Sequence, residues 1–488
     1  MMNRKTINSY DTIATYIGIF MILDATILLL PLLVLIWFPE EISYASSFLV
    51  PALASALFGG LLISRRGEHL KSQQDAIVVI LVWVVSALVA SIPFLLSGQL
   101  NFSQAVFESV SGWTTTGLSV MDVSETPKIF LMHRTILQFF GGVGLVLVMF
   151  STLTSTYGPK LYTAEGHSDK LLPNLAKSAR SVLSIYVGYT FVGTILYKLA
   201  GMNWFDALNH AICAISTGGF STKVDSIGAY NSLSIEAITI LLMLLGTTNF
   251  AAHMLFINGK VRKTFRIGEI RFMFLVISVS IPLMYFFSLK SIDSNLATGL
   301  RTTTFQVVSA LSTTGFSTTG YDNWPAFSVL LMILLMLIGG GTGSTAGGIK
   351  LNRVYVLMKS ILWELRAKLM PRSTVTTNYV YRPEGKVYME SHDILEISNY
   401  AFLYMLLYLA GVLVMVQYGY PLKSALFEYA STIGTVGLSI GITNSQTPSP
   451  VLWIQSAGML LGRLEIYVVF IALIKFCKDA KCLVVGRR

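Results

Sequence analysis

Charged residues are scarce in this chain of 488 residues, at 12%, whereas 53% are hydrophobic. Soluble globular domains carry about 25% charged residues, so the composition excludes an ordinary soluble protein. Cysteine is also scarce, with three residues. Cys213 falls in a short predicted helix, and Cys477 and Cys482 fall in the predicted C-terminal tail. Their spacing fits neither a disulfide framework nor a zinc site.

Histidine is limited to six residues, which are scattered along the chain. An enzyme working inside a membrane needs converging groups, such as a Ser/His set, paired aspartates or zinc-binding histidines, and the sequence offers no such set. We therefore predict neither an enzyme nor an organic cofactor. The net charge of +10 is divided among short loops without interleaved aromatic residues, which argues against a nucleic-acid partner.

Long apolar stretches are what the chain does contain. A helix of about 20 apolar residues crosses a bilayer. The first stretch is far longer than the core of a signal peptide and is not followed by an Ala-x-Ala site, so we expect a retained helix that contacts membrane lipid. The predicted spans are ten, at residues 13–37, 46–64, 76–97, 129–155, 182–201, 232–257, 272–290, 326–360, 397–418 and 450–476.

Basic residues predict the orientation of these spans. With the N-terminus inside, 27 of the 35 Lys and Arg residues fall in cytoplasmic segments and 7 in outer ones, with Arg463 left inside a helix. The positive-inside rule favours this arrangement. We expect a multi-pass protein of the plasma (inner) membrane with both termini cytoplasmic.

A polar run interrupts the apolar pattern four times. The runs align on Gly117, Gly219, Gly315 and Gly437, and Glu108, His210, Gln306 and Glu428 then stand nine residues upstream in each case. Repetition at a fixed register indicates one structural unit used four times. A stretch too short to span precedes each run, such as Asn101–Thr114 or Pro421–Ile433, so each unit is predicted to dip into the membrane from outside.

The expected fold is an all-α polytopic membrane protein with four pseudo-symmetric helix–pore loop–helix repeats around one pore, plus two N-terminal transmembrane helices. All repeats start and end inside, unlike inverted repeats. The linker 361–396 reads as a cytoplasmic loop with no domain of its own. The predicted segments are 1–75 for the N-terminal helices, then 76–181, 182–271, 272–396 and 397–488 for the four repeats.

The polar runs have the composition of a cation filter. Non-helical backbone is tolerated at membrane depth where it is buried or lines water, and glycine lets successive carbonyls point to one axis. Rings of carbonyls can replace the water around an alkali cation. For a single run, an ordinary helix-packing turn would be the better interpretation, but four runs in a shared register argue against it. The predicted ligands of the alkali cation are Thr115, Thr116, Gly117, Leu118, Thr217, Gly218, Gly219, Phe220, Thr313, Thr314, Gly315, Phe316, Thr435, Val436, Gly437 and Leu438.

A glycine-rich segment breaks the second helix of the third repeat after Ile338. It lacks the Gly-Lys-Ser/Thr order of a phosphate-binding loop. Two interpretations remain: a close-packed helix kink, or a loop beneath the filter that obstructs the pathway. In the second, the gate consists of Gly339, Gly340, Gly341, Thr342, Gly343, Ser344, Thr345, Ala346, Gly347, Gly348, Lys350 and Arg463.

Arg463 is a charge inside a predicted span, where burial costs about 2.5–3.5 kcal/mol or more. It either pairs with Glu465 or helix carbonyls, or projects into the pore and repels the cation. The four aligned residues upstream of the glycines, beginning with Glu108, are expected to brace the filter from behind through hydrogen bonds, because an ionised carboxylate there is expensive.

Together with Gly339–Lys350 and Gly462–Ile466, the four runs resemble the Trk/Ktr/HKT superfamily of potassium transporters, over residues 10–480. The two extra N-terminal helices and the segment Lys170–Pro173 are more similar to the TrkH type than to the shorter Ktr type. The resemblance implies K⁺ uptake, a homodimer and a cytosolic nucleotide-binding regulatory subunit similar to TrkA or KtrA. A Na⁺-permeable or weakly selective relative of the same fold is the alternative.

Overall fold

The computed structural model describes residues 2–65, 74–144, 175–287, 295–321, 323–371 and 377–485. The segment Lys170–Pro173 and the second half of the predicted span 129–155 lie outside these residues. The chain divides into two compact units. The first comprises residues 1–114, 119–184 and 444–488, and the second comprises residues 115–118 and 185–443.

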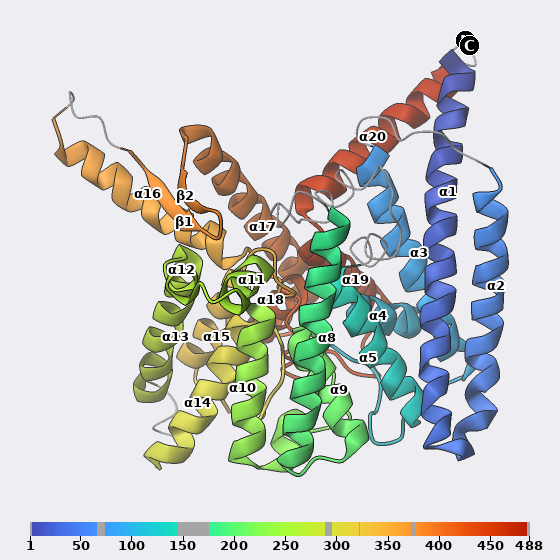
Figure 1. Cartoon of the computed structure of the whole chain (residues 1–488), viewed down its shortest axis with the longest axis horizontal. Coiled ribbons are helices and arrows are strands. Elements are labelled where there is room, and N and C mark those ends of the chain that lie inside the picture. Colours follow the sequence, from blue (N-terminus) through green and yellow to red (C-terminus); the bar gives the residue numbers. More distant parts are fainter. Residues whose placement is uncertain are drawn as a thin grey trace. The chain divides into compact units, whose positions relative to one another are not determined.

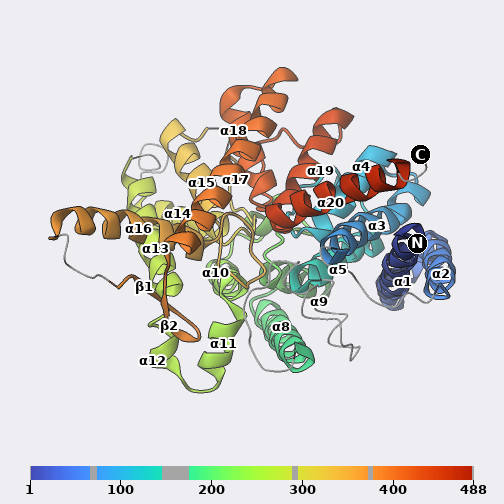
Figure 2. The same cartoon turned by 90° about the horizontal axis from the view of Figure 1, so that it is seen from above.

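Long apolar helices dominate the first unit, and α1 and α2 run side by side (Figures 1 and 2). The Ser55 hydroxyl on α2 donates to the Met21 carbonyl on α1 at 2.7 Å. Phe48, Phe94 and Phe130 form a buried core between α2, α3 and α5. The helices of this unit are α1 (Met2–Leu29), η1 (Leu30–Ile36), η2 (Pro39–Tyr44), α2 (Ala45–Ile63), α3 (Gln74–Leu96), α4 (Phe102–Trp113), α5 (Lys128–Val143), α19 (Ser449–Arg463) and α20 (Ile466–Val485).

The second unit contains three of the four short helices that were predicted to dip into the membrane, and α8 runs into it from the first unit. Its elements are α8 (Leu175–Leu199), α9 (Trp204–Ile215), η3 (Ser226–Tyr230), α10 (Leu233–Thr247), α11 (Phe250–Ile257), α12 (Val261–Thr264), α13 (Gly268–Phe287), α14 (Leu296–Leu311), α15 (Ala326–Ile338), α16 (Leu351–Leu369), β1 (Tyr379–Arg382), β2 (Gly385–Tyr388), α17 (Ser391–Gln417) and α18 (Leu422–Ile433).

Six helices in the described part of the chain are long and apolar enough to cross a membrane. Two bent helix pairs raise that number to eight if each pair counts as one crossing. The sequence predicted ten spans. One of the other two continues beyond the described residues at Gly144, and the other contains the 13-residue helix α15, which is too short to cross alone.

The predicted continuous spans 232–257 and 450–476 are wrong in detail. The helix pair α10 and α11 is bent by 107°, and the pair α19 and α20 by 108°. At the first bend the Asn249 side chain accepts a hydrogen bond from the Ala251 N–H and starts a new helix. At the second, Leu464 is extended, with φ −81° and ψ 149°. Apolar composition alone does not reveal such bends, because neither site contains proline.

The predicted break after Ile338 is confirmed. Helix α15 ends at Ile338, Gly339 follows with φ +70°, and no helix resumes before Leu351. The non-helical segment, residues 339–350, is called the glycine-rich loop below.

The linker 361–396 is more ordered than the sequence indicated. Helix α16 continues to Leu369, and an antiparallel hairpin pairs Tyr379 with Tyr388 and Arg382 with Gly385. Val380 on this hairpin is fully buried against Val356 and Met389. The predicted tail is also helical, since α20 extends to Val485 and carries Cys477.

Candidate functional site

Four short helices, α4, α9, α14 and α18, lead into the four polar runs, as predicted. They end at Trp113, Ile215, Leu311 and Ile433, in each case two residues before the threonine that opens the run. Asparagine side chains cap the first three helices by accepting a backbone N–H of the first turn. Because a helix C-terminus carries partial negative charge, each polar run begins next to a negative helix end.

The backbone of the four runs is strained in the same way each time. The opening threonines, Thr115, Thr217, Thr313 and Thr435, have φ of 52°, 50°, 55° and 48°. The glycines two residues later have φ of 89°, 70°, 79° and 94°. A threonine rarely adopts positive φ, and such strain persists only where its surroundings fix it. Four unrelated helix-packing turns would have no reason to share this pattern.

The aligned glycines lie next to one another in a closed ring, within the second unit. A Cβ on Gly117 would lie 2.1 Å from the Gly218 carbonyl oxygen, and one on Gly219 would lie 2.0 Å from that of Thr314. A Cβ on Gly315 would lie 1.9 Å from the Val436 carbonyl oxygen. One on Gly437 would lie 2.2 Å from the Thr116 carbonyl oxygen, which closes the ring. The four loops therefore meet around one axis, and only glycine fits where each loop contacts the next.

The hydroxyls of the four opening threonines differ in their partners. Thr217 donates to the Ser216 carbonyl, and Thr313 accepts the Gly347 N–H. The hydroxyls of Thr115 and Thr435 are buried and have no hydrogen-bond partner within the described chain. A buried hydroxyl oxygen without a partner is suited to an ion ligand.

The residues nine positions before the glycines all contact the segment just after their own filter run. Glu108 accepts the Ser119 hydroxyl at 2.9 Å, His210 Nε2 lies 3.0 Å from the Ser221 hydroxyl, and Glu428 accepts the Ser439 hydroxyl at 2.8 Å. In the third repeat, Gln306 donates to Thr318 at 3.3 Å and accepts the Tyr321 hydroxyl. Glu and His thus make an equivalent contact with a serine, and Gln306 contacts a threonine one position further along.

The carboxyl groups of Glu108 and Glu428 have different kinds of partner. Arg134 Nε lies 2.8 Å from Glu108, and both side chains are buried. Glu428 instead accepts the backbone N–H groups of Ile440 and Thr443 as well as the Ser439 hydroxyl. A buried carboxylate is tolerated where several donors or a cation satisfy it, and both sites meet this condition.

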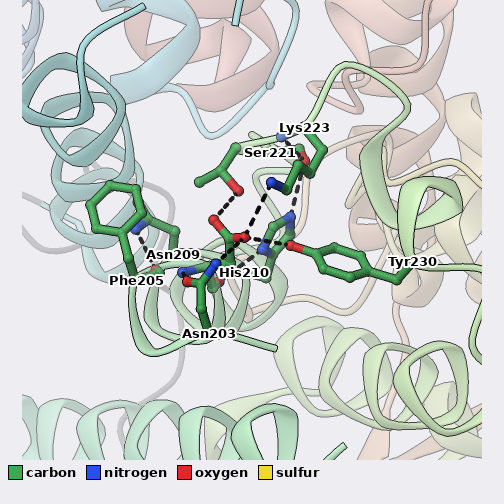
Figure 3. A network of polar contacts seen from close by, with 9 residues as sticks. Asn203, Phe205, Asn209, His210, Ser221, Lys223 and Tyr230 are labelled. Carbon is green, nitrogen blue, oxygen red and sulfur yellow. Dashed lines mark hydrogen bonds and ion pairs between the residues drawn. The ribbon is translucent and has the colours of Figure 1, made fainter. Parts of the chain in front are cut away.

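Figure 3 shows the denser network around His210. His210 Nδ1 donates to the Asp206 backbone carbonyl at 2.8 Å. In the neutral imidazole ring, Nε2 therefore accepts the hydrogen bond from the Ser221 hydroxyl. The Asp206 carboxylate accepts the hydroxyls of Thr222 and Tyr230, and Lys223 Nζ lies 3.6 Å away. Asp206 and Tyr230, which the sequence did not single out, fix the histidine in place.

The glycine-rich loop packs directly against the opening threonines. The Thr345 hydroxyl lies 3.1 Å from that of Thr217, and the Gly347 N–H donates to Thr313 Oγ1 at 2.8 Å. A Cβ on Gly347 would lie 2.0 Å from Thr435 Oγ1. The loop thus contacts the opening threonines of the second, third and fourth repeats, on the side where the short helices end.

Two polar side chains that sequence reasoning missed hold this loop. Glu269 at the start of α13 accepts the Thr342 N–H at 2.6 Å and the Asn352 N–H at 3.2 Å. The Asn249 amide donates to the Thr342 carbonyl at 2.5 Å. Glu269 stands next to an apolar stretch in the sequence, but nothing in its spacing indicated a partner 73 residues away.

The two basic residues predicted for the gate both donate to backbone carbonyls. Lys350 Nζ donates to the Ala346 carbonyl within the glycine-rich loop. Arg463, at the end of α19, donates to the carbonyls of Gly141 and Gly142 at 2.5 and 3.0 Å. These carbonyls end α5 and have no intrahelical partner, so pairing with helix carbonyls, one of the two predicted alternatives, is present.

These features define a polytopic membrane protein built around four re-entrant helix–loop units. The chain belongs to the TrkH family of cation transport proteins, whose sequence pattern matches residues 45–482. It is a transporter and not an enzyme, as predicted, and a multi-pass protein of the plasma membrane.

Curated relatives match nearly the whole chain. An uncharacterized cation transporter of Methanocaldococcus jannaschii is 30% identical over 91% of each chain. The Trk system potassium uptake protein TrkG of Escherichia coli is 30% identical over 95% of this chain and 98% of its own. The crystal structure of the potassium transporter TrkH from Vibrio parahaemolyticus matches with a TM-score of 0.83 and 28% identity, over 95% of this chain and 98% of that one.

Proposed function

We propose that this chain takes up K⁺ across the plasma membrane through a filter formed by its four polar runs. The ring of close contacts among Gly117, Gly219, Gly315 and Gly437 is the observation that carries the proposal. The names of the relatives, potassium uptake proteins and a potassium transporter, support K⁺ as the ion.

In this proposal, the backbone carbonyls of residues 115–118, 217–220, 313–316 and 435–438 replace the hydration shell of the ion. The free hydroxyls of Thr115 and Thr435 add ligands at the end next to the short helices. The negative helix ends favour a cation there. Glu108, His210, Gln306 and Glu428 brace the ring through the contacts described above and do not touch the ion.

The glycine-rich loop is proposed to close the pathway below the filter. Its contacts with Thr217, Thr313 and Thr435 support this role, and its glycines lose much entropy on ordering, so alternative arrangements differ little in free energy. We propose that Lys350 fixes the loop, and that Arg463 places a positive charge on the cytoplasmic side of the pathway, where it repels K⁺.

We further propose that the chain works as a homodimer, with both termini in the cytoplasm, and is regulated by a cytosolic nucleotide-binding subunit of the TrkA or KtrA kind. The word "system" in the names of its relatives favours a multi-subunit arrangement. The basic residues around the hairpin, including Lys359 and Lys386, which stack on Tyr379, provide a cytoplasmic surface for such a partner.

The decisive experiment is ⁸⁶Rb⁺ uptake into liposomes that contain only this chain, competed by K⁺ or by Na⁺. We expect K⁺ to compete at far lower concentrations than Na⁺. Equal competition would favour the weakly selective alternative, and no uptake above empty liposomes, with or without a nucleotide-binding subunit, would refute the proposal. In the Gly117→Ser variant, the concentrations of K⁺ and of Na⁺ needed to compete with ⁸⁶Rb⁺ should be closer to each other, because the serine side chain would collide with the Gly218 carbonyl.

A further inference from the structure

An acidic residue lies in the middle of the first apolar span. Asp24 stands about halfway along residues 10–36, and no other Asp, Glu, Lys, Arg or His occurs between Asp11 and Glu40. Its exposed fraction is 2%. Ionisable residues at this depth are rare and, when present, mark a function. Nothing in the proposed filter or gate uses this carboxyl group.

The carboxyl group of Asp24 has few partners. Its Oδ2 lies 2.8 Å from the Ser86 hydroxyl on α3, and its Oδ1 is buried without a hydrogen-bond partner in the described part of the chain. By contrast, the buried Glu108 has Arg134 at 2.8 Å, and Glu428 accepts three donors. Asp24 therefore lacks the cation or the several donors that satisfy the other two buried carboxyl groups.

Within the residues that the structure describes, the helices around Asp24 offer it no cation. The elements packed against α1 are α2, α3 and η1. Helix α2 and η1 contain no charged residue, and α3 has only Asp75 in its first turn. Within α1, Lys5 and Arg4 lie about 28 and about 30 Å away along the helix axis. Helix α20 meets α1 at Tyr10, where its Lys475 is paired with Asp479.

We propose that Asp24 is a proton-binding site: its carboxyl group holds a proton at neutral pH, and loss of that proton slows cation uptake. An ionised carboxylate in apolar surroundings without a cation is strongly disfavoured, so the group takes up a proton instead.

Ser86 connects this site to the first short helix. Its side chain bonds Asp24, while its carbonyl oxygen accepts the Trp113 indole N–H at 3.2 Å. Trp113 is the last residue of α4 and stands two residues before Thr115 in the sequence. An ionised Asp24 would draw water or move away from its apolar site, and Ser86 would be displaced with it. Deprotonation should therefore disturb the end of α4.

The test compares infrared spectra of the full chain in lipid vesicles at pH 7. We expect a carbonyl stretch of a protonated carboxyl group that is absent from Asp24→Asn and shifted in Ser86→Ala, which removes the one side chain in the described part of the chain that hydrogen-bonds Asp24. The control Asp11→Asn should keep the band, since Asp11 is partly exposed and lies 3.8 Å from Arg65. If the infrared spectra of the parent chain and of Asp24→Asn do not differ in this carbonyl stretch, the proposed proton site is refuted. This result does not depend on K⁺ transport.

The same preparations test the effect on transport. As pH is raised, the infrared band and ⁸⁶Rb⁺ uptake should decline together in the parent chain, and uptake by Asp24→Asn should stay constant over that range. An equal decline in both proteins, with the band titrating only in the parent chain, overturns the effect on transport.

Discussion

Individual residues in this chain are best understood from the groups they face. Position nine before the filter glycine is Glu, His, Gln and Glu in the four repeats, yet the first, second and fourth all lie next to a serine hydroxyl two residues after the glycine. A register shared by such different side chains reflects a shared contact rather than a shared charge. The residue type then depends on the other donors nearby.

Glu428 provides a test at this scale. In Glu428→Ala the Ser439 hydroxyl and the N–H groups of Ile440 and Thr443 lose their acceptor. An unsatisfied buried group costs about 1–3 kcal/mol, so we expect a clear fall in thermal stability in detergent. The control Glu364→Ala removes an exposed ion pair with Lys368, which contributes about 0–1 kcal/mol. Equal stability of the two variants would contradict the bracing role.

A second residue-scale prediction concerns Gly315. An alanine there would place its Cβ 1.9 Å from the Val436 carbonyl oxygen, so Gly315→Ala should abolish both ⁸⁶Rb⁺ uptake and the rise in unfolding temperature that bound K⁺ gives.

The control for this variant is Gly419→Ala. Gly419 has a similar φ, +88° against +79°, but nothing lies within 4 Å of its Cβ position. Both variants therefore share the backbone strain of positive φ, and only Gly315→Ala adds the collision. If the two retained the same response to K⁺, the ring of glycines would not be the ion site.

At the scale of elements, breaks in helices determine where polar groups gather. The bends after Thr247 and Arg463, and the loop after Ile338, all leave backbone carbonyls and N–H groups without intrahelical partners. Asn249 and Glu269 satisfy some of them at the glycine-rich loop, and Arg463 plays the same part for carbonyls at the end of α5. Two of these breaks, after Thr247 and after Ile338, lie in the second unit and contribute backbone next to Thr217.

The glycine-rich loop can be loosened without changing its glycines. Thr345→Val keeps the shape of the side chain but removes the hydroxyl that contacts Thr217 and the carbonyls of Ile215 and Gly246. Loss of about 1 kcal/mol of hydrogen bonding should raise the open fraction, and with it ⁸⁶Rb⁺ uptake, about fivefold.

Two further variants make this prediction specific. Ser344→Ala removes a hydroxyl whose contacts, with Gly341 and Ala346, stay inside the loop, and it should change uptake much less. Thr345→Ser restores the hydroxyl and should return uptake to the parent level. Unchanged uptake in Thr345→Val would count against the loop as a gate.

At the scale of the whole molecule, charge distribution predicts orientation. Single cysteines introduced at Gln99 and Glu384, both exposed, should react from opposite sides of the membrane once the native cysteines are replaced by serine. We expect an impermeant maleimide added to intact cells to label position 99, before α4, and to leave position 384, in the hairpin, unlabelled until the cells are opened. Labelling in the reverse order would place the four short helices on the cytoplasmic side.

The sequence by itself determined the class of protein, the four short helices, the aligned glycines and the break after Ile338. These features follow from composition, repetition and glycine content, which act locally along the chain. It did not reveal the bends at Asn249 and Leu464, because neither bend is marked by a proline or by a run of glycines. Nor did it show the hairpin around Val380.

Only the tertiary structure decided which groups meet. Glu269 reaches Thr342, Arg463 reaches the end of α5, Asp24 shares Ser86 with Trp113, and each filter glycine contacts the next loop. Such pairings join residues far apart in the sequence and depend on how helices pack. The sequence shows which chemical group each partner has. The distance between partners is fixed only when the apolar helices are buried against one another.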